Sequence, residues 1–210
     1  MTYQEAYQKA TGELKAAGIP EPESDAWILL EHVTGMTRTR YYVDGFERMP
    51  KNEEDRFFEL VSCRKTRIPV QHLTGVQEFM GYEFAVNEHV LVPRQDTEIL
   101  VEEAEKRLLL MKKENPVKVL DMCTGSGCIQ FSLPISTKPS NPQIVIEGAD
   151  ISEEALKVAE KNAKKLGVSG KWIQTDIFEN ITGTFDMITS NPPYIPTKVI
   201  EELEAEVRLH

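Results

Sequence analysis

Ser190-Asn191-Pro192-Pro193-Tyr194 is the stretch of this sequence whose residue types point most directly to chemistry. Its two prolines fix φ and carry no backbone N–H, so the carbonyl of Asn191 or Pro192 remains to accept a hydrogen bond from an incoming NH₂ group. Tyr194 offers a flat face on which a planar amide or base can lie. The pattern predicts a site for such a group, formed by Asn191, Pro192, Pro193 and Tyr194. The alternative is a rigid proline turn with an incidental asparagine.

A glycine-rich turn, Asp121-Met122-Cys123-Thr124-Gly125-Ser126-Gly127, is the second candidate for a binding site. Gly125 and Gly127 allow a ligand to approach the backbone without a Cβ clash, and the turn follows a predicted strand, where open α/β sheets bind ligands. A dinucleotide fingerprint would need glycine where Gln130 stands, and no Gly-Lys-Ser/Thr of a P-loop follows. The turn indicates a ligand site of another kind or, alternatively, a purely structural tight turn.

Two further strand ends carry residues suited to an adenosyl ligand. Asp150 lies 23 positions after Gly127 and can accept hydrogen bonds from both hydroxyls of a ribose; alternatively, it is an acidic residue at a helix start. Asp176 and Ile177 follow the next strand and can flank an adenine, polar on one side and apolar on the other. Taken together, the ends of three successive strands indicate an adenosyl ligand.

Methyl transfer to an amide nitrogen explains why acceptors and an adenosyl site occur together. The nitrogen is a poor nucleophile because its lone pair is delocalised, so it must be held by acceptors and oriented in line with the methyl–sulfur bond. Acceptor dipoles also stabilise the positive charge that develops on nitrogen. A sulfonium such as S-adenosylmethionine is already an activated donor, so the reaction requires neither a metal nor a nucleophilic residue. The three cysteines and four scattered histidines show no zinc or disulfide spacing, and we expect no metal site.

The elements that must position these residues begin with a helical part. Residues 1–75 are predicted to form a small all-helical domain with a capping box at Thr2 and Glu5. Its second helix is expected to end at Gly35 and its third to begin with Asn52 as N-cap. Residues 76–95 are predicted to be a β-hairpin linker whose two strands are separated by Asn87-Glu88.

Residues 96–210 are predicted to form an α/β domain that carries the candidate site. Asp96 is expected to cap a helix that runs to about Lys113. The strands that follow are expected over residues 117–120, 144–149, 171–174 and 185–189, with a helix from Ser152 to Gly167. Alternating strands and helices indicate a parallel, doubly wound sheet. Pro134 should end or kink the helix after the glycine turn, because an interior proline costs about 3 kcal/mol.

The composition limits the classes of partner. A formal net charge of −10 argues against stable nucleic-acid binding, and no apolar stretch approaches the roughly 20 residues of a membrane span. The N-terminus lacks the basic start and apolar run of a signal peptide, so we expect a cytoplasmic protein. We also expect a monomer. The cluster Arg64-Lys65-Thr66-Arg67 either faces a charged partner or is a solvated helix end.

With these motifs in view, the chain resembles the HemK/PrmC family, the protein-(glutamine-N5) methyltransferases that modify peptide chain release factors. The likeness covers nearly the whole chain. It rests on these segments: Pro69 to Gly75, Gln77-Glu78-Phe79, Val92-Pro93-Arg94-Gln95-Asp96-Thr97-Glu98, Asp121 to Gly127, Asp150-Ile151-Ser152 and Asn191 to Ile195. Asn-Pro-Pro-Tyr also occurs in adenine-N6 methyltransferases, but its combination with the Pro-Arg-Gln-Asp-Thr-Glu segment is more specific.

The resemblance implies methyl transfer from S-adenosylmethionine to the glutamine in the Gly-Gly-Gln loop of bacterial class 1 release factors, on a Rossmann-like sheet. Asn191 and the Pro192 carbonyl would hold the glutamine amide, with Tyr194 packed on it. The cofactor would contact these residues: Cys123, Thr124, Gly125, Ser126, Gly127, Asp150, Ile177 and Asn191. The N-terminal helices would help to bind the release factor.

The family's catalytic domain continues beyond Asn-Pro-Pro-Tyr to a seven-stranded sheet, whereas this chain stops at His210 after four expected strands. We therefore expect the methyltransferase domain to be incomplete at its C-terminus, with an unpaired strand edge. Two alternatives stay open: an adenine-N6 methyltransferase that acts on nucleic acid, and a truncated module that binds a cofactor or partner without turnover.

Overall fold

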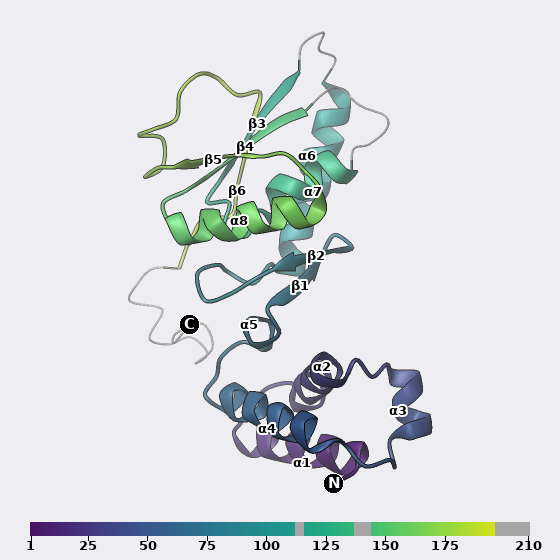
Figure 1. The fold of residues 1–210 in the computed structure, drawn as a ribbon. Coiled ribbons are helices and arrows are strands. Elements are labelled where there is room, and N and C mark those ends of the chain that lie inside the picture. The colour runs from purple at the N-terminus through teal and green to yellow at the C-terminus, as the bar shows by residue number, and fades with distance from the viewer. Residues whose placement is uncertain (112–115, 137–143, 196–210) are drawn as a thin grey trace. The chain divides into compact units, whose positions relative to one another are not determined.

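The computed structural model describes residues 1–111, 116–136 and 144–195. The chain separates into two compact units, built on Met1–Thr74 and on Gly75–Tyr194 (Figure 1). Each unit has its own core of buried apolar side chains.

The first unit is helical. Its capping box is confirmed, since the Glu5 amide donates to the Thr2 hydroxyl at 3.1 Å and the Thr2 amide donates to the Glu5 carboxylate at 2.8 Å. The Asn52 cap is wrong. Pro50 is the N-cap, and its carbonyl accepts the first helical hydrogen bond from the Glu54 amide. The described helices are α1 (Tyr3–Ala16), α2 (Pro22–Thr34), which ends at Gly35 as expected, α3 (Arg38–Asp44), α4 (Lys51–Lys65) and α5 (Val70–Thr74).

The basic cluster at the end of α4 is used inside this unit. Arg64 is buried and donates to Asp25 at 2.6 Å, and Lys65 pairs with Glu13. Arg67 donates to the two backbone carbonyls that directly follow α1. These contacts favour the structural role of the cluster over a surface for a charged partner.

The second unit contains a parallel sheet in the order β5-β4-β3-β6. The strand expected over 171–174 has those bounds, and the other three lie within two residues of theirs. The ladder extends β3 to Met122, and β6 starts two residues later than expected because Asp186 instead contacts Lys118 through its backbone amide and carboxylate. The bounds are β3 (Val117–Met122), β4 (Ile144–Asp150), β5 (Lys171–Gln174) and β6 (Met187–Ser190).

The hairpin lies within residues 76–95 as predicted, but the prediction of its turn is wrong. Strands β1 (Val76–Phe79) and β2 (Tyr82–Ala85) are joined at Met80-Gly81, not at Asn87-Glu88. Both turn residues have positive φ, 51° and 74°, which is the signature of a type I′ turn that matches the twist of the strands. Methionine gives no warning of such a turn. The hairpin belongs to the Gly75–Tyr194 unit.

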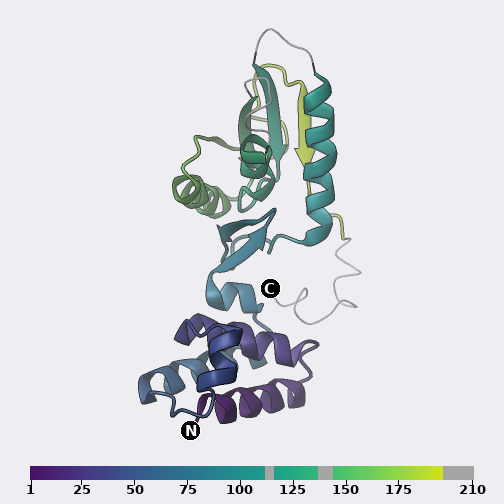
Figure 2. The same ribbon diagram turned by 90° about the vertical axis from the view of Figure 1, so that its right-hand side faces the viewer.

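Three helices pack against the sheet: α6 (Gln95–Leu110), α7 (Cys128–Ser136) and α8 (Glu153–Leu166). Figure 1 shows α8 crossing in front of the strands, and Figure 2 shows α6 along its length. Val117, Val119 and Ile146 share one core with these helices, whereas Leu120 and Met122 join a smaller cluster. The sheet therefore has a core cluster on each of its two faces.

The ends of these helices test the capping predictions. Ser152 caps α8, and Gly167 closes it at a φ of 65°, as predicted. The Asp96 cap is wrong: Arg94 is the N-cap of α6, and Asp96 lies in the first turn, where its charge suits the helix dipole. Lys113 lies outside the described residues. Helix α7 continues two residues past Pro134, which cannot donate to the Gln130 carbonyl.

Candidate functional site

The predicted site residues lie at the carboxyl ends of the parallel strands. All neighbouring strands are parallel, and the register pairs Met122 with both Ala149 and Ser190, and Asp150 with Gln174. The carboxyl ends of the four strands therefore lie side by side. Successive strands β3, β4 and β5 run in one direction across the sheet, and β6 returns to the other side of β3. This reversal is the switch point at which α/β sheets bind ligands.

The glycine turn is anchored by its backbone. The Thr124 amide donates to the Ala149 carbonyl at 3.0 Å, and the Gly125 amide donates to the Asp150 carboxylate at 2.9 Å. Cys123, with φ at 58°, is a non-glycine residue held in the left-handed region, a strain typical of functional sites. A Cβ at Gly125 would meet nothing within 4 Å, so there is room beside the turn.

Asp121 connects the turn to the strand that leads to Asn191. It is fully buried, and its carboxylate accepts hydrogen bonds from the hydroxyls of Thr124 at 2.7 Å and Thr189 at 2.8 Å. Burial raises the pKa of Asp121 from 3.8 to about 6, and the nearby charge of Asp150 adds to the increase, while the two hydroxyl donors oppose it. One carboxylate thus holds two neighbouring strand ends.

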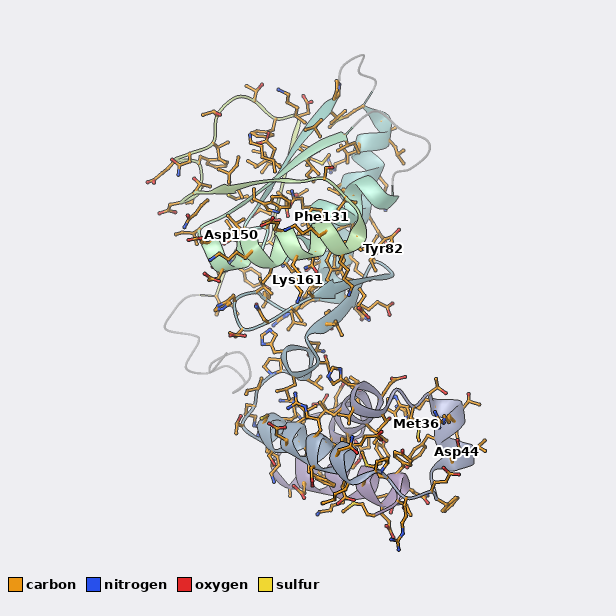
Figure 3. The ribbon with its side chains drawn as sticks, viewed as in Figure 1. Met36, Asp44, Tyr82, Phe131, Asp150 and Lys161 are labelled. Carbon is orange, nitrogen blue, oxygen red and sulfur yellow. The ribbon has the colours of Figure 1, made fainter. Side chains whose placement is uncertain are left out.

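Asp150 and the residues near it fit an adenosyl group. Figure 3 shows Asp150 beside the start of α8. Its oxygens accept from the amides of Gly125 and Ser152, which fixes the carboxylate beside the turn, and a carboxylate has lone pairs left for further donors. Ile151 and Ile177 are large apolar side chains that remain more than 60% exposed. A fixed carboxylate and exposed apolar side chains at neighbouring strand ends could hold a ribose and a purine, and Asp176 is also exposed.

The Asn-Pro-Pro-Tyr segment follows β6 at the same end of the sheet. The Asn191 side-chain NH₂ donates to the hydroxyl of Thr97 at 3.2 Å, so the donor half of this amide is bound within the protein. Pro192, Pro193 and Tyr194 are exposed, and Tyr194 presents 72% of its surface. The segment can therefore receive a planar group from solvent next to the glycine turn.

Sequence reasoning missed two residues that hold this site. Thr97, which contacts Asn191, belongs to the Pro-Arg-Gln-Asp-Thr-Glu segment, but its spacing gave no sign of the contact. Asn162 of α8 is fully buried and bonds the glycine turn and the hairpin. A polar residue within the inner apolar stripe of that helix was the signal that could have revealed it.

Gln130 explains why the dinucleotide fingerprint is absent. Its side chain is fully buried and packs on Gly148 of β4, where a Cβ would lie 2.4 Å from the Gln130 amide oxygen. The close approach of helix and strand that a third glycine would permit is achieved here by a glycine on the strand instead.

Other features of the described residues point to no second site for this chemistry. A hollow of about 430 Å³, lined by Ile144 to Glu147 and Gly167 to Lys171, contains none of the predicted site residues. Among the described side chains, no cluster of His, Cys, Asp and Glu could hold a metal ion. No described helix has the length and apolar character needed to cross a membrane.

Both parts of the chain are similar to known proteins. Residues 5–75 match the family described as PrmC N-terminal domain, and residues 95–206 match the methyltransferase small domain. The release factor glutamine methyltransferase of Deinococcus radiodurans is 36% identical over 208 residues, which cover 99% of this chain and 72% of that protein. Proteins of the same name from Moorella thermoacetica and Escherichia coli K12 are also 36% identical, with the same shares covered.

Proposed function

The chain belongs to the release factor glutamine methyltransferase family, and from that membership we propose its reaction. It transfers a methyl group from S-adenosylmethionine to the side-chain amide nitrogen of the glutamine in the Gly-Gly-Gln motif of bacterial class 1 peptide chain release factors. The proposal rests mainly on one observation: the glycine turn and the Asn-Pro-Pro-Tyr segment follow the carboxyl ends of two adjacent parallel strands, β3 and β6. A release factor substrate also assigns the reaction to the cytoplasm.

The cofactor would be held along the ends of β3, β4 and β5. The fixed carboxylate of Asp150 would accept the ribose hydroxyls, and the turn from Cys123 to Gly127 would face the remainder of the ligand. Ile177 and Asp176 would flank the adenine. When bound, S-adenosylmethionine supplies an electrophilic methyl group on a positively charged sulfur.

The protein's part in the reaction is to hold and orient the glutamine amide. Since Thr97 binds the NH₂ of Asn191, the Asn191 Oδ1 atom is the half of that amide suited to accept from the substrate, together with the Pro192 carbonyl. Two acceptors on one NH₂ group fix its plane and stabilise the positive charge that develops on nitrogen. Tyr194 would pack against the flat amide. The nitrogen gives up one proton, and exposure of Pro193 and Tyr194 allows water to receive it.

Incubation of the chain with labelled S-adenosylmethionine and a class 1 release factor tests the proposal. Label should enter the release factor and disappear when the glutamine of Gly-Gly-Gln is replaced by alanine. Asn191→Ala should reduce the transfer rate by about 10² to 10³, as loss of one transition-state contact does. Asn180→Ala is the matched control, since Asn180 is exposed and its side-chain NH₂ donates to the backbone carbonyl of Gln174.

Three outcomes contradict the proposal. Label that survives replacement of the glutamine would exclude this target. Methyl groups found in DNA or RNA but not in protein would favour the adenine-N6 reaction. Tight S-adenosylmethionine binding without any transfer would favour a binding module.

A further inference from the structure

Asn162 of α8 is a fully buried amide that bonds two separate parts of the second unit. Its NH₂ group donates to the Ser126 carbonyl at 2.8 Å and to the Ala85 carbonyl at 3.0 Å, and its Oδ1 accepts from the Ala85 amide at 2.6 Å. We propose that Asn162 is a positioning residue that holds the glycine turn and the β1–β2 hairpin in one fixed arrangement.

Burial of this side chain requires a reason beyond packing. It lies in the inner stripe of α8 among Ala155, Ala159 and Ala163, where an apolar residue would incur no desolvation cost. Both donor hydrogens and the acceptor are used, so the buried amide is satisfied only while the turn and the hairpin keep their places. Such a satisfied network specifies one arrangement of the backbone.

The glycine turn is the partner that most needs an external constraint. Gly125 and Gly127 have φ of 54° and 78°, and glycine adopts many other conformations at little cost. The bond from Asn162 fixes the carbonyl of Ser126, and hence the plane of the peptide between Ser126 and Gly127. A flip of that peptide would break this bond and also the bond from the Gly127 amide to the Thr124 carbonyl, and would leave polar groups on both sides without partners.

The hairpin receives the other two bonds of this amide. Ala85 ends β2, and Asn162 takes both its N–H and its carbonyl, as a neighbouring strand would. At its other end, the hairpin is tied to α6, because the Met80 amide donates to Glu98 at 2.6 Å. The adjacent residue on that helix, Thr97, binds Asn191. The hairpin is therefore connected by hydrogen bonds to both candidate halves of the site.

A ligand that selects one conformation of the turn must then stabilise the hairpin, since coupling between two sites is reciprocal. The inference rests on the proposed placement of S-adenosylmethionine at the turn. In the wild-type protein, saturating S-adenosylmethionine should slow hydrogen exchange of the Ala85 amide. An exchange rate that does not respond to the cofactor would overturn the proposal without any variant.

Two variants on the same helix sharpen the test. Asn162→Leu keeps the size of the side chain and removes all three bonds, so the Kd for S-adenosylmethionine should rise about tenfold and the cofactor-dependent protection of Ala85 should vanish. Val158→Ala removes buried apolar contacts in the cluster with Val86, Val90 and Ala155, one turn away, and leaves the three hydrogen bonds of Asn162 in place. Its Kd should stay within about twofold of wild type.

Asn162→Leu with a wild-type Kd would refute the positioning role, as would an equal loss of affinity in Val158→Ala, which would indicate general destabilisation. If Asn162→Leu does not fold, the wild-type exchange result decides. Neither measurement needs a release factor. Failure of methyl transfer to glutamine and failure of this coupling are thus separate results.

Discussion

Replacing Asp121 by asparagine should change how the stability of the protein depends on pH. Burial raises the pKa of Asp121 from 3.8 to about 6, so the folded state holds the proton more tightly than the unfolded chain does. The stabilising protonated form is fully present below the unfolded pKa. Wild-type stability from this group is therefore lost as pH rises from about 4 to about 6.

The size of the effect follows from the pKa difference. Between about pH 4.5 and about pH 7, the wild type should lose about 2 kcal/mol through Asp121, because one pKa unit corresponds to about 1.4 kcal/mol. An asparagine at this position does not titrate. Urea unfolding of both proteins at several pH values in this range gives, for each, a curve of the free energy of unfolding against pH. The other titratable groups contribute alike to both curves. The free energy of unfolding of the variant minus that of the wild type should increase by about 2 kcal/mol as pH rises.

Thr189→Val supplies an independent check on the sign. Its hydroxyl donates to the Asp121 carboxylate and stabilises the charged form, so its removal should raise the pKa further and extend the loss to higher pH. Parallel stability curves for the wild type and Asp121→Asn would refute the reasoning, because they would show that this carboxylate has the same pKa in the folded and unfolded states.

Three further changes test the geometry of the site. Gly127→Ala should destabilise the protein by more than Gly125→Ala in urea unfolding, since both have positive φ but only at 127 would a Cβ overlap an aromatic ring, at 2.3 Å; equal losses would contradict the close packing of Phe131 on Gly127. Thr97→Val should lower kcat about tenfold, because it frees the amide of Asn191 to rotate; an unchanged kcat in steady-state kinetics would exclude this role. Asp150→Ala should weaken S-adenosylmethionine binding at least about tenfold by calorimetry, and an unaltered Kd would remove Asp150 from the cofactor site.

The local signals in the sequence predicted much of the second unit. Strand β5 and the capped helix α8 were placed correctly because apolar runs and cap residues coincide there. The turn of the hairpin was missed because Met80, at a φ of 51°, lacks the asparagine or aspartate that usually marks a type I′ turn. Tertiary context determined that conformation.

The candidate site shows the same division. The motifs at the strand ends could be recognised because each follows an apolar strand, and the parallel register brings them to one edge. Contacts between distant residues could not be predicted in this way. Thr97 and Asn191 are 94 positions apart, and no periodicity relates a helix start to the end of a strand. The contacts of Asn162 with Ala85 and Ser126 could not be predicted for the same reason.

The packing of Gln130 on Gly148 makes these two positions mutually dependent. An added methyl group at 148 would collide with the amide of Gln130, so alanine there is tolerable only beside a shorter residue at 130. A shorter residue at 130 with Gly148 retained would instead leave a void beneath the glycine turn. Each single substitution is expected to destabilise the protein more than the two substitutions made together. Evolution at these positions would therefore pass through a less stable single variant or change both residues at once.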